Sequence, residues 1–167
     1  AERPLFLAGG GVRAARAGKE MTALAEKTGI PVVTTIMGMG ALPTDHPLYV
    51  GNLGVHGSYA ANMAVRGCDV LFSIGVRFSD RITGKAEEFA KNAVIIHVDI
   101  EPESASRDVK ADITVKADAK EAIVGLLDRA EELEGGGWRR EIREWGRNRP
   151  LAAGQWGESG VTPLAVM

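Results

Sequence analysis

Short runs of apolar residues alternate with segments of helical periodicity along most of this chain. Two runs, 70–74 and 93–100, are almost wholly apolar, as in strands that are buried on both faces of a parallel sheet. Further runs that predict strands lie at 4–8, 32–35 and 113–116. Strands that alternate with helices in this way predict an α/β fold: a doubly wound, mainly parallel, Rossmann-like sheet of five or six strands with helices on both faces.

Helical spacing marks several segments between the predicted strands. Apolar residues recur every three or four positions over 14–25, and a glycine and a proline end that helix. Ser58 is a suitable N-cap for a helix over 59–66. Asp118 opens a capping box before a helix whose apolar positions run to 133. We expect these helices to cover the two faces of the sheet.

The glycine-rich segment 134–137 predicts a boundary between a nucleotide-binding domain over 1–134 and a C-terminal helix and linker over 135–167. The helix carries an apolar stripe among arginines, and a packed stripe beneath a solvated face explains it better than a nucleic-acid or interdomain surface. The stripe consists of Trp138, Ile142 and Trp145. Residues 151–167 have little pattern and are expected to be a linker. Because the sequence starts without methionine and enters a strand at once, we expect a domain excised from a longer protein.

Composition narrows the classes of function. The chain has 167 residues, of which 45% are hydrophobic and 25% charged, and its formal net charge is -2. That charge gives no reason to expect a nucleic acid or a membrane as a partner. There is no signal peptide, and we expect a cytoplasmic location. The single Cys68 excludes an internal disulfide, has no cluster of metal ligands beside it and is best explained as a small core residue.

Glycines and arginines cluster where two of the predicted strands end. Three consecutive glycines, Gly9 to Gly11, precede a helix, and such a unit can bring backbone N–H groups to a phosphate. A structural turn that needs positive φ explains them equally well. Gly75 ends the run 70–74, and the guanidinium groups of Arg77 and Arg81 after it are suited to phosphate. Because ligands bind beyond the carboxyl ends of such strands, these groups predict a ligand site.

Three further features bear on this site. Asp99 falls at the end of a strand, where a carboxylate can accept hydrogen bonds from ribose hydroxyls, while His97 within the strand is expected to be a satisfied core histidine. The loop 36–48 is long and rich in glycine, methionine and proline, and loops of this length are often functional. A second glycine cluster over 51–57 includes His56, for which a structural hydrogen bond is the simpler explanation.

Several motifs follow one another in a distinctive order from about residue 3 to residue 133. They are Gly9-Gly10-Gly11, Met37-Gly38-Met39-Gly40-Ala41-Leu42-Pro43, His46-Pro47, Leu53-Gly54-Val55-His56-Gly57, Gly75-Val76-Arg77-Phe78-Ser79-Asp80-Arg81-Ile82-Thr83-Gly84, Ile100-Glu101-Pro102 and Ala117-Asp118. In this order they closely resemble the central domain of the acetolactate synthase (acetohydroxyacid synthase) large subunit, within the thiamine-diphosphate-dependent enzymes. Val161-Thr162-Pro163 is similar to the start of that family's next domain.

The resemblance implies a parent enzyme that condenses two 2-oxo acids, with loss of carbon dioxide, in branched-chain amino-acid biosynthesis. Thiamine diphosphate and Mg²⁺ would be held by flanking domains, which carry a catalytic glutamate and a Gly-Asp-Gly motif that is absent from this sequence. The central domain would be a DHS-like, NAD/FAD-binding type that binds FAD without net redox chemistry and supplies no catalytic residue or metal ligand. The parent would be a homo-oligomer with a regulatory small subunit, and the chain alone would not catalyse.

The resemblance also implies which residues bind FAD. Gly10 and Gly11 would approach the diphosphate or ribityl portion, and Gly75, Arg77 and Arg81 would hold the phosphates and ribityl chain. The adenosine would be framed by Asp99, Ile100 and Asp118. The flavin-proximal section would be lined by Thr35, Ile36, Met37, Leu53, Gly54, His56 and Gly57.

Three positions depart from the family's pattern: Ser79 replaces an aspartate, Ser104 a common glutamate and Ala117 a customary glycine. The change at 79 removes a charged acceptor near the flavin chain. Two alternatives stay open. One is a cofactor-free structural module of another thiamine-dependent decarboxylase or carboligase. The other is a stand-alone NAD- or ADP-binding enzyme of the deacetylase type, which would need zinc-binding cysteines that one cysteine cannot supply.

Overall fold

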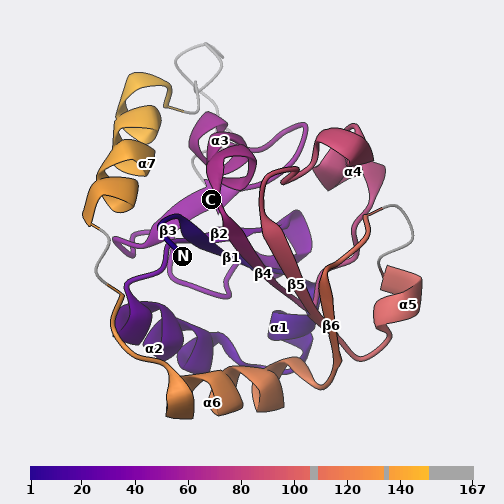
Figure 1. The fold of residues 1–167 in the computed structure, drawn as a ribbon. Coiled ribbons are helices and arrows are strands. Elements are labelled where there is room, and N and C mark those ends of the chain that lie inside the picture. The colour runs from indigo at the N-terminus through magenta and orange to yellow at the C-terminus, as the bar shows by residue number, and fades with distance from the viewer. Residues whose placement is uncertain (106–108, 134–135, 151–167) are drawn as a thin grey trace, which may run out of the picture.

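Six parallel strands form one sheet in the order β3-β2-β1-β4-β5-β6 (Figure 1). This computed structural model describes residues 1–105, 109–133 and 136–150. The strands are β1 (Pro4–Ala8), β2 (Val32–Thr34), β3 (Tyr49–Asn52), β4 (Val70–Ile74), β5 (Val94–Asp99) and β6 (Ile113–Lys116). The order is that of the Rossmann fold, in which the sheet is extended first on one side of β1 and then on the other. The predicted doubly wound α/β fold is confirmed.

Helices cover both faces of this sheet. One face is covered by α1 (Gly10–Ala14), α2 (Gly18–Thr28) and α6 (Ala119–Arg129), of which α2 and α6 lie side by side (Figure 1). The other face is covered by α3 (Tyr59–Gly67) and α7 (Gly136–Asn148), which pack against each other. The shorter elements are η1 (Ile36–Gly38), α4 (Asp80–Thr83), η2 (Ala86–Glu88) and α5 (Pro102–Ala105).

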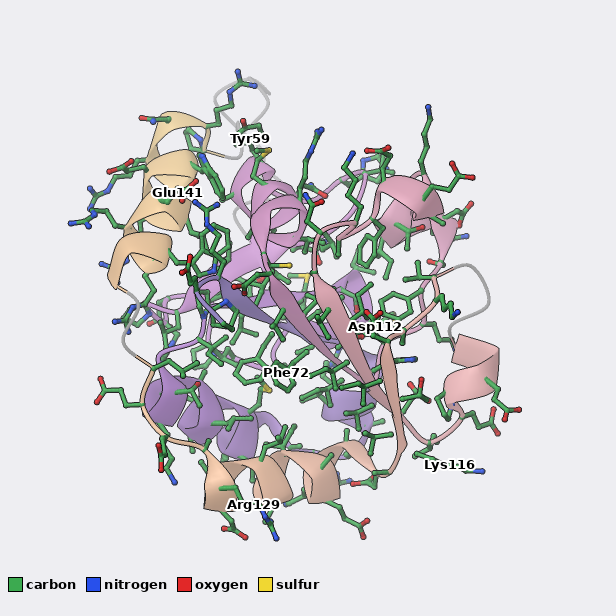
Figure 2. The ribbon with its side chains drawn as sticks, viewed as in Figure 1. Tyr59, Phe72, Asp112, Lys116, Arg129 and Glu141 are labelled. Carbon is green, nitrogen blue, oxygen red and sulfur yellow. The ribbon has the colours of Figure 1, made fainter. Side chains whose placement is uncertain are left out.

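Strand alternation divides the core into two layers. In β1, Leu5 and Leu7 face the α3–α7 layer, while Phe6 and Ala8 face the α2–α6 layer. All four are at most 2% exposed, so the central strand is buried on both faces. Phe72 of β4 lies between the sheet and the α2–α6 layer (Figure 2), where its ring is tilted against that of Phe6 at 5.5 Å.

Three details of the elements differ from the sequence-based prediction. Strand β3 is an additional edge strand, and it went unrecognised because it is half-buried and contains a glycine. The helix predicted over 14–25 is two helices, because Arg16 takes a left-handed conformation with a φ of 53° and the chain turns between α1 and α2. Helix α6 ends at Arg129 and does not reach residue 133.

Helix α7 packs onto the domain through its apolar stripe, as predicted. Trp138 and Ile142 are each 5% exposed, and the indole N–H of Trp138 donates to the carbonyl of Pro4 at 3.1 Å. The predicted domain boundary falls at 134–135, and the predicted linker at 151–167, both outside the described residues. No helix within the described ranges is long and apolar enough to cross a membrane.

Candidate functional site

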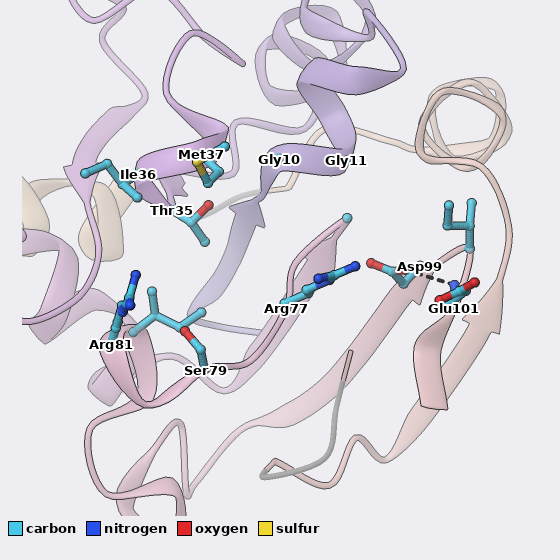
Figure 3. Close-up of a pocket in the computed structure, with 13 residues that line it drawn as sticks. Gly10, Gly11, Thr35, Ile36, Met37, Arg77, Ser79, Arg81, Asp99 and Glu101 are labelled. Carbon is cyan, nitrogen blue, oxygen red and sulfur yellow. Dashed lines mark hydrogen bonds between the residues drawn. The ribbon is translucent and has the colours of Figure 1, made fainter. Parts of the chain in front are cut away.

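A cleft of about 510 Å³ opens beyond the carboxyl ends of β1 and β4, where the strand order reverses (Figure 3). Ligands of doubly wound folds bind at such a switch point, because the two strands continue toward opposite faces and leave a crevice between them. The lining residues are Gly10, Gly11, Thr35, Ile36, Met37, Gly75, Arg77, Ser79, Arg81, Ile82, Asp99, Ile100 and Glu101. The structure thus brings most of the predicted binding residues together. The exceptions are Leu53, Gly54, His56, Gly57 and Asp118.

The two glycine turns at this switch point touch each other through their backbones. The Gly11 N–H donates to the Gly75 carbonyl at 3.0 Å, and a Cβ on Gly11 would lie 2.6 Å from the Gly75 Cα. A Cβ on Gly9 would collide with the same carbonyl. Positive φ is not the reason for the first cluster, because only Gly75 of these residues has one, at 60°. The glycines of this cluster allow a close approach between two loops.

The guanidinium groups of Arg77 and Arg81 are the strongest electrostatic feature of the cleft. Arg77 follows β4 directly, and Arg81 lies in the short helix α4 (Figure 3). Both side chains are exposed, and within the described part of the chain neither forms a hydrogen bond or an ion pair. Two unpaired cations on the wall of one cleft are suited to an anionic ligand with more than one charge.

Acidic residues lie at the other end of the cleft from Arg81 (Figure 3). The carboxylate of Asp99, the last residue of β5, accepts a hydrogen bond from the Glu101 N–H at 2.9 Å, which fixes its orientation. A second hollow of about 220 Å³ continues from there and shares Gly11 and Gly75 with the cleft. Asp118 lines this hollow and caps α6 by accepting from the N–H groups of two following residues. The predicted N-cap is confirmed, although among the described residues the Glu121 side chain makes no return hydrogen bond that would complete the capping box, and Asp118 is adjacent to the cleft.

Three exposed aliphatic side chains line the cleft. Ile36 and Met37 are 65% and 66% exposed at the start of the long loop, and Ile100 is 62% exposed beyond β5. The Thr35 hydroxyl caps η1 by accepting from the Gly38 N–H at 3.1 Å, which holds this part of the loop in place. Apolar side chains beside a few polar groups are typical of small-molecule binding sites.

The second glycine cluster, over 51–57, contacts the backbone of the cleft wall at Arg81. The Val55 N–H donates to the Arg81 carbonyl at 3.2 Å, and a Cβ on Gly54 would lie 2.6 Å from that carbonyl oxygen. Leu53 is buried in the core. The structural hydrogen bond expected of His56 is absent, because its side chain is exposed and forms no hydrogen bond with any described residue. In this structure the cluster contacts the backbone that carries Arg81 and does not line the cleft.

Two of the three positions that depart from the resembled family line the cleft or the hollow beside it. Ser79 lines it at the N-cap position of α4, yet its hydroxyl makes no cap hydrogen bond. Ala117 lines the second hollow beside Asp118. Ser104 lies in α5, beyond the end of β5. The replacement at 79 therefore leaves a neutral hydroxyl on the cleft wall between the two arginines.

Two buried titratable side chains stand outside the cleft. Burial lowers the pKa of His97, against the opposing effects of the Val76 carbonyl and Asp99. Burial raises the pKa of Cys68 to about 12, so this thiol behaves as the predicted core residue. His97 is fully buried, as expected. Only one of its two ring nitrogens is hydrogen-bonded, because Nε2 has a partner and Nδ1 has none among the described residues. Within the same residues, no group of three His, Cys, Asp or Glu could hold a metal ion.

Sequence reasoning missed two residues of the cleft wall and one behind it. Ile82 and Glu101 line the cleft, although they lie inside motifs that were recognised. His97 contacts the loop that carries Arg77, and a histidine in a buried strand gives no sequence signal of which loop it will reach.

Comparison with known proteins extends this description. Residues 1–126 match the family model described as "Thiamine pyrophosphate enzyme, central domain". A protein of Methanocaldococcus jannaschii named probable acetolactate synthase large subunit is 52% identical over 133 residues, which cover 80% of this chain and 22% of that protein. The acetolactate synthase large subunit of Buchnera aphidicola subsp. Schizaphis graminum is 44% identical over 128 residues, 77% of this chain and 22% of that protein.

A plant protein shows the same relationship over nearly the full chain. Probable acetolactate synthase 2, chloroplastic, of Oryza sativa subsp. japonica is 41% identical over 175 residues, which cover 99% of this chain and 26% of that protein. The chain therefore spans about a fifth to a quarter of the length of these curated relatives.

Proposed function

This chain belongs to the thiamine pyrophosphate enzyme family as a central domain, and on that premise we propose that it binds FAD in the cleft between β1 and β4. The observation that carries the proposal is the pair of unpaired guanidinium groups, Arg77 and Arg81, on the wall of a switch-point cleft. A dinucleotide presents two linked phosphates, and a guanidinium forms charge-assisted hydrogen bonds to phosphate oxygens.

The other groups of the cleft fit the remaining parts of FAD. The carboxylate of Asp99, held by the Glu101 N–H, suits the hydroxyl groups of a ribose. The exposed side chains of Ile36, Met37 and Ile100 provide apolar surface for ring systems. A volume of about 510 Å³, continued by the hollow at Asp118, lies in the range of about 300–1,000 Å³ of small-molecule sites. Bound FAD would be held and shielded here by side chains that have no acid or base role.

The main alternative to FAD binding is a structural module that binds no cofactor. The backbone contact between Gly11 and Gly75 explains those glycines without a ligand. It does not explain why two arginines are exposed on one cleft wall without an acidic partner among the described residues. Single exposed arginines occur elsewhere on the chain, but these two lie on the wall of one switch-point cleft, and that placement favours the binding function.

Titration with FAD tests the proposal, with ADP as a second ligand that lacks the flavin. Arg77→Ala should weaken binding by about 1.5–3 kcal/mol, the range for hydrogen bonds to charged groups, or roughly 10- to 150-fold. Arg140→Ala is the matched control, since it removes an exposed arginine of α7, a helix that contributes no residue to the cleft lining. Absence of saturable binding by the unaltered chain would favour the structural module instead.

We further propose that the whole protein is an acetolactate synthase, which condenses two 2-oxo acids with loss of carbon dioxide. The names of the relatives support this activity, although the chain spans only 22–26% of their lengths. Thiamine diphosphate and Mg²⁺ would be bound outside this chain, which has no Gly-Asp-Gly motif. Flanking domains, a homo-oligomer, a regulatory small subunit and a cytoplasmic location remain predictions of the same kind.

A further inference from the structure

A buried histidine is bonded to the loop that carries Arg77. The side chain of His97, in β5, reaches the segment that follows the neighbouring strand β4, with its Nε2 3.0 Å from the Val76 carbonyl oxygen. A carbonyl oxygen can only accept, so Nε2 carries the hydrogen and donates it. Val76 immediately precedes Arg77, and the hydrogen bond therefore acts one residue away from the guanidinium that lines the cleft.

The rest of this loop is attached to β5 as well. The Gly75 N–H donates to the Val98 carbonyl at 2.8 Å, which extends the strand pairing by one residue. The Phe78 ring packs against the His97 ring with their centroids 4.8 Å apart. Val76 and Phe78 are 1% and 4% exposed, so both neighbours of Arg77 point into the core while Arg77 itself is exposed. The loop is thus held on each side of Arg77.

Two buried polar atoms beside this hydrogen bond have no partner among the described residues. Ser73 of β4 is in register with His97, and side chains in register on neighbouring strands share one face of the sheet. The Ser73 Oγ and the His97 Nδ1 are both buried, and neither has a partner among the described residues. With the hydrogen on Nε2, the Nδ1 can only accept, and no hydrogen bond joins it to the Ser73 hydroxyl. Burial also lowers the pKa of His97, which keeps the ring neutral near pH 7.

We propose that His97 is a positioning residue for the ligand of the cleft. Its hydrogen bond to the Val76 carbonyl fixes the loop so that Arg77 faces the cleft, and His97 itself never touches the ligand. This inference rests on the proposed binding function, because it assigns His97 an effect on affinity that acts through Arg77. A histidine that only fills the core would instead affect stability and leave affinity unchanged.

The test compares variants of His97 in the whole chain. His97→Phe keeps a ring against Phe78 but loses the donor, whereas His97→Gln keeps an N–H donor at a similar reach. Ile95→Val, two residues away on the same strand and the same core face, controls for a general loss of stability. For each variant we would measure the Kd for ADP and FAD and the unfolding midpoint in urea.

Three results would support the inference. His97→Phe should weaken ADP binding about five- to tenfold, within the roughly tenfold or greater loss expected for Arg77→Ala, while His97→Gln restores most of the affinity. Ile95→Val should lower the unfolding midpoint without changing Kd. In the Arg77→Ala background, His97→Phe should cause no further loss of affinity, because the residue through which it acts is gone.

Other results would overturn it. Equal Kd values for His97→Phe and the unaltered chain, with Arg77→Ala clearly weaker, would reject the positioning role and leave the binding function intact. Additive losses in the double variant would show that His97 acts independently of Arg77. If the unaltered chain binds neither ligand, the proposed function fails and the effect on affinity fails with it. Hydrogen exchange of the 75–78 amides then still tests the loop, since unchanged exchange in His97→Phe would reject the fixing of the loop itself.

Discussion

The contact between the two glycine turns gives a quantitative prediction. In Gly75→Ala the new methyl group would lie 2.6 Å from the Gly11 Cα and 3.0 Å from the Gly11 N and C. Carbon atoms in contact are normally about 3.5–4.0 Å apart, so the two loops would have to separate by about 1 Å. This separation would lengthen the Gly11–Gly75 hydrogen bond and displace Arg77, two residues further along.

Two costs add in this variant. A left-handed conformation costs an alanine about 1–2 kcal/mol, since Gly75 has a φ of 60°. Overpacking costs about 1–3 kcal/mol more, so the free energy of unfolding should fall by about 2–5 kcal/mol. Gly40→Ala is the matched control, because Gly40 has a φ of 89° but nothing within 4 Å of its Cβ position. That variant should lose only the conformational cost of about 1–2 kcal/mol.

Urea unfolding followed by tryptophan fluorescence measures both losses, and ADP titration measures the effect on the cleft. Domain stabilities are typically about 5–15 kcal/mol, so most of each variant should remain folded without denaturant. Gly75→Ala should lose more stability than Gly40→Ala. It should also lose most of its affinity for ADP. Equal stability losses in the two variants, together with normal affinity for ADP, would refute the close-contact argument.

Two further predictions concern pH and turnover. The pKa of His97 is lowered in the folded chain, so below its unfolded pKa of about 6.5 the unfolded state binds a proton that the folded state does not, and stability should fall as pH falls. Urea unfolding at pH 7.5 and pH 5 should therefore show a larger loss in the unaltered chain than in His97→Gln, and equal losses would contradict it. The chain incubated with pyruvate, thiamine diphosphate, Mg²⁺ and FAD should form no acetolactate, because the chemistry belongs to thiamine diphosphate and this sequence lacks the Gly-Asp-Gly motif. Turnover that copurifies with the chain would show that the chemistry has been misplaced.

Much of the fold could be predicted because its strongest signals are local. The central strands, such as β4, are apolar runs buried on both faces, and the caps at Ser58 and Asp118 are formed by the side chains that the sequence suggested. Strand β3 could not be recognised in this way, since an edge strand with intermediate burial has no distinctive pattern. The left-handed Arg16 was hidden for a similar reason, because the helical spacing of the alanines continues through it.

The candidate site was predictable at strand ends and less so between loops. Arg77 follows one apolar run and Asp99 lies at the end of another, so the rule for parallel sheets brings them to the same edge. The role of Gly54 could not be inferred, because it depends on the approach of the Arg81 carbonyl from a distant part of the chain. The same is true of His97, whose partner is fixed by the register between β4 and β5.

The position of β1 at the centre of the sheet has a consequence for the order of folding. Its two neighbours are β2 and β4. The edge of β1 that pairs with β4 stays without hydrogen-bond partners until residues 70–74 have been synthesised. During synthesis, an N-terminal portion that ends before β4 has an unpaired β1 edge and an uncovered apolar surface, which invites pairing with other chains. Pairing between strands this far apart in sequence is slow, so we expect the pairing of β1 with β4 to be a late step in forming the sheet. The same step places Arg77, which follows β4, at the cleft.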